Sequence, residues 1–215
     1  MEPFTTLTAV AAPLLRDNID TDIIIPSREM RDPLGRGLAE GLFAGWRYTA
    51  IGSRDPDPDF VLNRPRYADA GILVAGANIG CGSSREHAVW ALAQYGFRAV
   101  IAPSFNAIFR GNCVANGIVP AAVTAAAAAE IAALLESAAE PMLTVDLESR
   151  TITTPSDKLW RFEIGDEARE ALMLGLDPIG QTLLLRDRIA AFREADRERR
   201  GWAYSALADT TGPAQ

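Results

Sequence analysis

Short apolar runs bounded by turn residues recur along the first half of the chain, a pattern that predicts buried strands. Three such runs are Asp22–Pro26 (DIIIP), Gly71–Gly76 (GILVAG) and Arg98–Pro103 (RAVIAP). Helical spacing of apolar residues follows the second and third runs, over residues 89–96 and from an N-cap at Ser104 to Gly117. This alternation of strand and helix predicts an α/β fold.

The second half of the chain contains further elements of both kinds. The alanine-rich segment 125–138 carries one apolar stripe and predicts a helix. Three alternating runs joined by short polar turns, MLTVDL, TITT and LWRFEI, predict antiparallel strands. A last helix is expected over about residues 181–199, with Leu185, Ile189 and Phe192 directed inward.

Residues Ser27–Pro65 interrupt this pattern and are rich in Gly, Pro, Arg and Asp. So long an irregular stretch in a compact domain is commonly functional or mobile, and we expect a mobile loop with one short helix near Leu38–Phe43. The length of the chain predicts a single domain. We expect this domain over residues 1–200, with a flexible loop at 27–65 and a C-terminal tail at 201–215.

Composition and charge exclude several classes of protein. With a formal net charge of −7 over 215 residues, the chain lacks the basic surface that nucleic acid requires. Lys158 is the only lysine, and its polar turn suits neither a phosphate-binding loop nor a Schiff base. Cys81 and Cys113 are too few for a disulfide framework or a Cys-ligated iron–sulfur cluster. Since no leader or long apolar run is present at the N-terminus, we expect a cytoplasmic chain that binds no membrane.

One segment, Gly80–Ala88 (GCGSSREHA), gathers two glycines, two serines, an arginine, a glutamate and the only histidine. It lies between a predicted strand and the N-terminus of a predicted helix, where free backbone N–H groups and the helix dipole favour an anion. Arg85 in a first helical turn requires an anionic partner, either a substrate carboxylate or Glu86. The segment is therefore a candidate site for a carboxylate or phosphate.

Helix capping is the competing explanation for the same residues. Ser83 and Glu86 match a capping box with Ser83 as the N-cap. A dinucleotide-binding loop would need glycine at Arg85, and a nucleophile elbow would need a second glycine after one of the serines. His87 is placed to act as a base for Ser83, although a helix buried on two faces favours a structural histidine.

Ser83 carries the most specific chemical expectation. A serine among backbone N–H groups at a positive helix end, with a guanidinium nearby, has its alkoxide form stabilised by hydrogen bonds and opposite charge. Such a serine can act as a base without a histidine.

Five separated stretches resemble one known family. In chain order they are NIDTDIIIP (18–26), GLFAGWRY (41–48), PRYADAGILVAGANIGCGSSREHAVWAL (65–92), VIAPSFNAIFRGNCVANGIVP (100–120) and GLDPIGQTLLLRDRIAAF (175–192). Together they are similar to the small subunit of 3-isopropylmalate dehydratase, a two-chain relative of aconitase in leucine biosynthesis. The resemblance covers about residues 5–195, and Ile79 and Val89 depart from it conservatively.

The resemblance implies a swivelling β/β/α domain, like the mobile C-terminal domain of aconitase, that closes over a large subunit carrying a [4Fe–4S] cluster. This chain alone would bind no metal. The family interconverts 2-isopropylmalate and 3-isopropylmalate by loss and re-addition of water. By the same resemblance Ser83 is the base, Ser84 and Arg85 bind substrate carboxylates, and Thr21 and Asp22 lie beside the site.

The loop after Asp22–Pro26 leaves the identity of the hydroxy diacid open. Its counterpart in the family helps to select the substrate, and here it carries Arg28, Arg31 and Arg36, with Met30 as the candidate contact for an isopropyl group. We assign Arg28 to substrate binding, and the alternative is that these arginines are solvated. Methylmalate or citraconate and homoaconitate are alternative substrates. A non-catalytic assembly module and a free-standing serine hydrolase are the alternative functions.

Overall fold

The computed structural model describes residues 1–30 and 35–204. The chain forms two compact units, and the first, Met1–Leu176, is called the body below. The second begins at Asp177, and its described part, Asp177–Tyr204, is called the C-terminal unit. The sequence-based division into a domain at 1–200 and a tail at 201–215 stays a prediction.

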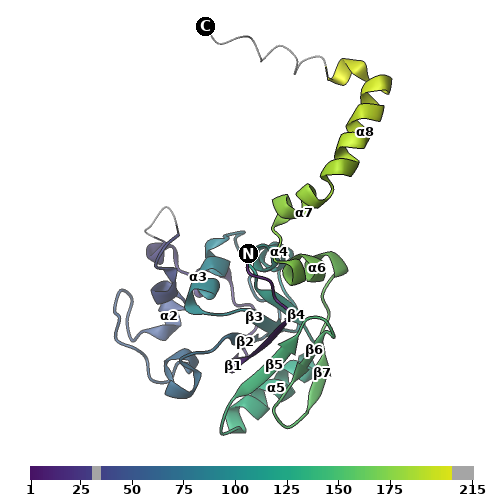
Figure 1. Ribbon diagram of the computed structural model, residues 1–215. Coiled ribbons are helices and arrows are strands. Elements are labelled where there is room, and N and C mark those ends of the chain that lie inside the picture. The colour runs from purple at the N-terminus through teal and green to yellow at the C-terminus, as the bar shows by residue number, and fades with distance from the viewer. Residues whose placement is uncertain (31–34, 205–215) are drawn as a thin grey trace. The chain divides into compact units, whose positions relative to one another are not determined.

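A seven-stranded sheet in the order β4-β3-β2-β1-β5-β6-β7 forms the centre of the body (Figure 1). The strands are β1 (Thr6–Leu14), β2 (Ile72–Ala75), β3 (Ala99–Ala102), β4 (Val119–Ala122), β5 (Met142–Asp146), β6 (Thr151–Thr153) and β7 (Leu159–Arg161). β1 joins a parallel half to an antiparallel half, because its end pairs with β2 (Ala11↔Ile72) and its beginning pairs with β5 (Thr6↔Asp146). The sheet is therefore mixed, as the alternating strands and helices of an α/β fold predicted.

The two faces of the sheet bury separate cores. Successive side chains of a strand point to opposite faces, so Leu73 joins one core and Val74 the other. The first core contains α3 (His87–Tyr95) and the segments between β1 and β2. The second contains α5 (Ala125–Ser137), which packs against β1, β2 and β3. The predicted strands over β2, β3 and β5–β7 and the predicted helices over α3, α4 (Ala107–Ala115) and α5 are confirmed.

The other described helices are divided between the body and the C-terminal unit. In the body they are α1 (Thr21–Ile24), α2 (Ala44–Arg47), α4 (Ala107–Ala115) and α6 (Asp166–Leu174), with 3-10 turns at Ser27–Glu29, Leu38–Gly41, Val61–Asn63 and Pro65–Tyr67. The C-terminal unit contains α7 (Pro178–Leu184), α8 (Arg186–Arg199) and a 3-10 turn at Gly201–Ala203. Within the described residues, no helix is long and apolar enough to cross a membrane.

The predicted strand over Asp22–Pro26 is wrong, because this segment begins as the helical turn α1. Asp20 caps the turn, and its Oδ1 accepts a hydrogen bond from the Ile23 backbone N–H at 2.7 Å. Such a cap contributes about 0.5–2 kcal/mol and here overrides the strand preference of three successive isoleucines. The N-cap predicted at Ser104 is also wrong, since Asn106 caps α4 instead.

The segment Ser27–Pro65 is more structured than a loop with one short helix. Besides the turn at Leu38–Gly41, it contains α2 and further 3-10 turns, and Leu42 and Phe43 are fully buried in the first core. Arg31 lies outside the described residues, and the expected mobility of the segment stays a prediction.

The C-terminal unit departs from the predicted helix over 181–199 in two ways. Two helices are present, with Leu185 between them. The side chains expected to face inward are exposed, by 45% for Leu185, 38% for Ile189 and 64% for Phe192.

Candidate functional site

Loops that follow the parallel strands β1 and β2 meet at one edge of the sheet. The Gly80 N–H donates to the Ile19 carbonyl at 2.7 Å, and the Thr21 N–H donates to the Cys81 carbonyl at 3.0 Å. These bonds hold the segment 19–22 beside the loop 80–86. Ligands of open α/β sheets bind at the carboxyl ends of the strands, so the position of these loops suits a binding site.

The loop after β3 is hydrogen-bonded to residues 78 and 79, which lead into the loop 80–86. Ile79 donates its N–H to the Ser104 carbonyl at 3.2 Å and accepts the Asn106 N–H at 3.0 Å. The Ser104 hydroxyl accepts the Asn78 N–H at 2.8 Å, which explains why this serine does not cap α4. The loop that carries the candidate residues is therefore fixed by backbone hydrogen bonds to both neighbours.

Two glycines shape the loop itself. Gly80 has φ +74°, and a Cβ there would lie 2.0 Å from Cγ of Phe109. Gly82 has φ +88°, a left-handed conformation that side chains other than glycine rarely adopt. Glycine at both positions lets the backbone pass close to Phe109 and then turn outward before Ser83.

Ser83 and Ser84 are exposed, and neither hydroxyl has a hydrogen-bond partner among the residues that the structure describes. The capping box is wrong, because α3 begins at His87, its N-cap position is Glu86, and no side chain caps it. The Glu86 carboxylate instead accepts a hydrogen bond from Asn116 Nδ2 at 3.0 Å. Both serines thus precede the helix on an open turn, where their hydroxyls are available to a ligand.

Arg85 forms an ion pair with Asp22, so of the two predicted partners, a substrate carboxylate or Glu86, the second is wrong. The side chain of Arg85 is 30% exposed and that of Asp22 is 57% exposed. Asp22 accepts from Nη1 of a guanidinium that has five donors, which leaves Arg85 able to receive a carboxylate as well. The structure therefore brings Asp22, Ser83, Ser84 and Arg85 to one surface.

Thr21 lies beneath this surface and is almost completely buried. It is 1% exposed, and its hydroxyl has no hydrogen-bond partner in the described part of the chain. Its Oγ1 would lie 3.7 Å from a Cβ placed on Gly82. A buried hydroxyl left unpaired costs about 1–3 kcal/mol. Thr21 is therefore the buried polar group nearest the turn of the loop.

Arg28 lies in the 3-10 turn Ser27–Glu29 and pairs with Glu29, with Nε 3.4 Å from Oε1. Glu29 also accepts from Arg54 at 2.6 Å, and this hydrogen bond raises the pKa of the Arg54 guanidinium. The assignment of Arg28 to substrate binding stays a prediction. Met30 is half-buried and packs against the first core.

Gln94 is a residue of interest that the sequence patterns did not reveal. From α3 it accepts the Leu38 N–H at 2.8 Å and donates to the Gly35 carbonyl at 2.5 Å. A side chain that pairs with backbone across 56–59 residues gives no local sequence signal. Through this amide, α3 holds the end of the loop that carries Arg28 and Met30.

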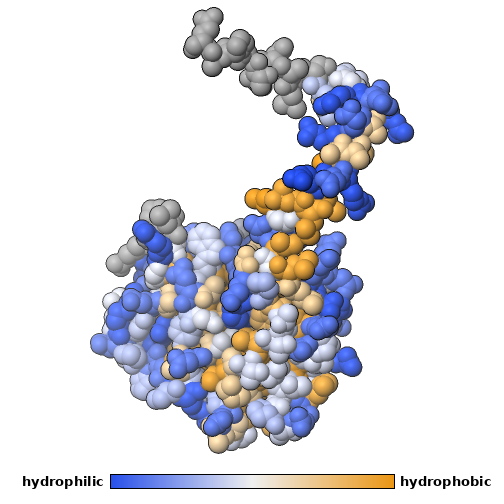
Figure 2. All heavy atoms as spheres, viewed as in Figure 1, coloured by the Kyte–Doolittle hydropathy of each residue, from blue (hydrophilic) through white to orange (hydrophobic). Residues whose placement is uncertain are grey.

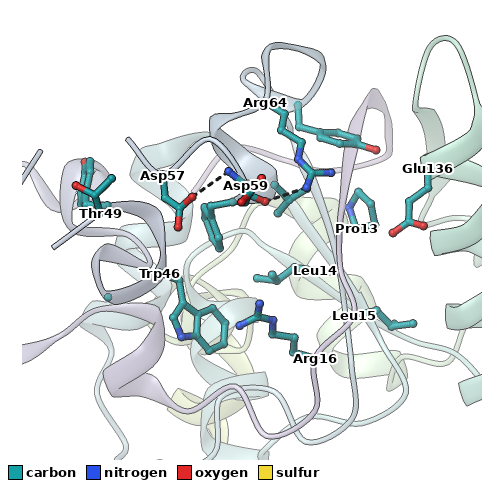
Figure 3. A pocket seen from close by; sticks show the side chains of 15 residues that line it. Pro13, Leu14, Leu15, Arg16, Trp46, Thr49, Asp57, Asp59, Arg64 and Glu136 are labelled. Carbon is teal, nitrogen blue, oxygen red and sulfur yellow. Dashed lines mark hydrogen bonds between the residues drawn. The ribbon is translucent and has the colours of Figure 1, made fainter. Parts of the chain in front are cut away.

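A hollow of about 560 Å³ lies elsewhere in the body, between the end of β1 and the segment 45–64 (Figure 3). Arg16 lies over the Trp46 ring there, with its guanidinium carbon 4.5 Å from the ring centroid. The loop 80–86 does not line this hollow. The exposed serines Ser83 and Ser84 of that loop therefore lie outside this hollow.

Metal ligands do not cluster in the described residues. No group of three or more His, Cys, Asp or Glu side chains among residues 1–30 and 35–204 is arranged to hold a metal ion. Cys113 is buried and Cys81 is half-buried on the candidate loop.

The fold and the open site define a domain of the aconitase type. Residues 1–126 match the family Aconitase C-terminal domain, and residues 129–166 match the family LeuD_N. The chain thus has the α/β fold of the aconitase C-terminal domain, and the predicted swivelling β/β/α class is confirmed.

Relatives narrow this class to one family. The chain is 55% identical over 95% of its length to the 3-isopropylmalate dehydratase small subunit of Cupriavidus necator, covering 99% of that protein. It is 47% identical over 94% of its length to the small subunit of the same name from Rhodospirillum centenum, again covering 99% of it. The solved 3-isopropylmalate dehydratase (LeuD) of Methanocaldococcus jannaschii is similar with a TM-score of 0.62 and 27% identity, covering 87% of this chain and 99% of that one. The chain belongs to the 3-isopropylmalate dehydratase small-subunit family.

Proposed function

We propose that the chain works as the small subunit of a 3-isopropylmalate dehydratase, a hydro-lyase of leucine biosynthesis. The observation that carries this proposal is identity of 55% with a named small subunit along 95% of the chain. The exposed turn Ser83–Ser84 beside the Arg85–Asp22 pair supports it independently, because these groups suit a dicarboxylate. The reaction is the interconversion of 2-isopropylmalate and 3-isopropylmalate by dehydration and rehydration.

The site needs a second chain, and we propose that this partner is the dehydratase large subunit. An open surface of loops does not exclude water, so it requires an opposing wall. The described residues of this chain do not fit an iron–sulfur cluster, since they include two thiols, one of them fully buried. We therefore assign the [4Fe–4S] cluster, and the Lewis-acid chemistry that it supplies, to the large subunit. Working as one enzyme, the two chains would share the cytoplasm.

Ser83 is proposed as the base that removes the proton next to a substrate carboxylate. It lies four residues before the start of α3, at the positive end of that helix's dipole. Together with Arg85, this dipole favours negative charge at the serine oxygen. Arg85 and Ser84 bind the substrate carboxylates, Asp22 holds the guanidinium in place, and Thr21 supports the turn from below.

Replacing Ser83 by Ala tests the function with the reconstituted pair of chains. Loss of a positioned base lowers turnover by about 10²–10⁴-fold. Ser156→Ala, an exposed serine in the turn between β6 and β7, is the matched control and should leave kcat unchanged. Complex formation is followed by sedimentation in parallel, because Ser83→Ala should not affect assembly.

The same assay decides between the proposed substrate and its alternatives. Isopropylmalate, methylmalate, citraconate and homoaconitate are supplied separately to the wild-type pair. Turnover of another diacid with little turnover of isopropylmalate would replace the substrate, and full activity of Ser83→Ala would remove the base assignment. A complex with no turnover of any of them would indicate the non-catalytic assembly module.

A further inference from the structure

The C-terminal unit exposes large apolar side chains in a cluster. Within the 14 residues from 179 to 192, six large apolar side chains are 38–70% exposed: Ile179, Leu183, Leu184, Leu185, Ile189 and Phe192. Figure 2 shows this apolar surface over α7. In the body, exposed large apolar residues occur singly, at widely separated positions such as Ile51, Ile108 and Leu159. Single exposed apolar residues are ordinary, whereas a contiguous group marks an interaction surface.

The large apolar residues of α8, together with Leu185 just before it, lie on one side of the helix. Leu185, Ile189 and Phe192 follow at intervals of four and three, which places them in one row. Asp196 continues the row, but Arg200 and Tyr204 occupy its carboxylate with three hydrogen bonds of 2.7–2.8 Å. The row of Leu185, Ile189 and Phe192 is called the α8 row below. The charge of Asp196, which follows the α8 row on the same side of the helix, is therefore paired within the C-terminal unit.

The catalytic loop cannot provide much apolar contact with a partner. Its exposed side chains are Ser83, Ser84 and Glu86, and the half-buried Arg85 pairs with Asp22, so all of these groups are polar. Substrate must also enter and leave there, so contact at this surface has to open during turnover. A lasting association therefore needs apolar burial at another place, since the well-packed apolar centre of an interface carries most of its binding free energy.

The C-terminal unit is shared with proteins named as small subunits. The alignment with the Cupriavidus necator protein covers 95% of this chain. About eleven residues at most therefore lie outside it. Even if all of these were C-terminal, the alignment would still include α7 and α8. The aligned stretch therefore includes this surface. A protein named a small subunit works with a larger chain, so we take the large subunit as the occupant, and a second copy of this chain is an outcome of the test.

We propose that the α8 row, continued by Ile179 and Leu183 on α7, is the docking surface for the dehydratase large subunit. This inference rests on the proposed function and names the contact that keeps the two chains together. Only Gly175 and Leu176 separate α6 from the Asp177 cap of α7. This docking surface therefore lies in a different part of the sequence from the loops that would open and close over substrate.

The test measures the dissociation constant between the full chain and the large subunit of the same organism, by sedimentation or calorimetry. Ile189→Asp with Phe192→Asp places two carboxylates in the row and should weaken binding about 100-fold or more. Ala190→Asp with Ala191→Asp is the matched control, since both alanines are exposed on the other side of α8. Circular dichroism checks helix content, and Ile189→Ala with Phe192→Ala, which keeps helix propensity, should still weaken binding about tenfold.

Turnover at saturating large subunit separates this inference from the proposed function. If the row only docks, the Asp variant recovers wild-type kcat at high partner concentration, because Ser83 and Arg85 are untouched. An unchanged dissociation constant would overturn the docking surface while leaving the enzyme assignment intact. A wild-type chain that dimerises alone, and is made monomeric by the Asp variant, would assign the row to a second copy instead. Normal binding by the wild-type pair without any turnover would remove the proposed function alone.

Discussion

Asp22 links two loops that are 63 residues apart, because its carboxylate pairs with Arg85. The pair is more than half exposed on the aspartate side, so its contribution to folding is small, about 0–1 kcal/mol. Its importance lies in orientation, since a guanidinium without a fixed partner samples many rotamers. Removing the carboxylate should therefore affect catalysis more than folding.

We expect Asp22→Asn to lower kcat/KM of the reconstituted enzyme about tenfold while the unfolding midpoint in urea changes little. Steady-state kinetics and a urea titration measure the two quantities. Asp69→Asn, an exposed aspartate before β2, removes the same charge and should change neither. A similar loss of activity in both variants would mean that net charge, and not the position of Arg85, is responsible.

The sequence predicted where these residues lie better than which groups they contact, and their roles in substrate binding and catalysis stay predictions. Ser83, Ser84 and Arg85 lie on one exposed loop beside Asp22, as the motifs indicated. The capping box failed because Gly82 turns the chain outward, so that α3 starts four residues after Ser83. Local patterns could not reveal the pairing of Arg85 with Asp22, since it depends on how strands β1 and β2 are placed in the sheet.

At the scale of elements, strands with a clear apolar run or a strict alternation were predicted, whereas β1 and β4, each of which contains a proline, were not. β2 and β3 are buried at every position, and their sequences show it. β1 was not predicted. Its first half contains threonine and alanine between its larger apolar residues, and its second half contains a proline, so neither half shows a clear apolar run. In the opposite direction, the cap at Asp20 places Ile23 and Ile24 in the helical turn α1, although an apolar run of this kind predicts a strand. Capping and pairing partners thus decided the outcome where hydrophobicity did not.

Asp146 connects β5 to the following turn and provides a pH-dependent test of the antiparallel half. The carboxylate accepts the Ser149 N–H and hydroxyl, both at 2.7 Å, and the Thr6 hydroxyl at 3.1 Å. The Ser149 backbone hydrogen bond is the largest cause that lowers the pKa of Asp146, while partial burial opposes it. An aspartate with a lowered pKa stabilises the fold above its unfolded pKa of about 3.9 and loses this effect as pH falls through the folded pKa.

We expect Asp146→Asn to lower the free energy of unfolding at pH 7 by less than about 1 kcal/mol, because solvent screens this carboxylate. The difference from wild type should begin to shrink below about pH 4, where the carboxyl of the unfolded chain becomes protonated, and should be lost as pH falls through the lowered folded pKa. Urea unfolding at a series of pH values measures it. A difference that stays constant down to pH 2 would show that shape, and not charge, is responsible.

At the scale of the whole molecule, chemistry and association are placed on different parts of the chain. The body carries the polar loop 80–86, and the C-terminal unit carries the apolar α8 row. The strand and helix patterns were sufficient to predict the α/β class. They could not predict the exposed row, because an amphipathic helix has the same sequence whether its apolar side faces its own core or another chain.

The two cysteines allow the body's cooperativity to be followed directly. Cys113 is fully buried in the first core on α4, and burial raises the pKa of its thiol, which disfavours the reactive thiolate. Cys81 is half-buried on the candidate loop.

In Cys81→Ser, alkylation of the remaining thiol should therefore be negligible in the native state. It should appear along the same urea curve as the loss of helical circular dichroism, because exposing Cys113 requires the core between α3 and the sheet to open. Mass spectrometry after a short iodoacetamide pulse at each urea concentration measures the labelled fraction. Labelling that precedes the circular dichroism transition would show that α4 opens separately, and that the turn at Gly80 over Phe109 loses its support before the sheet unfolds.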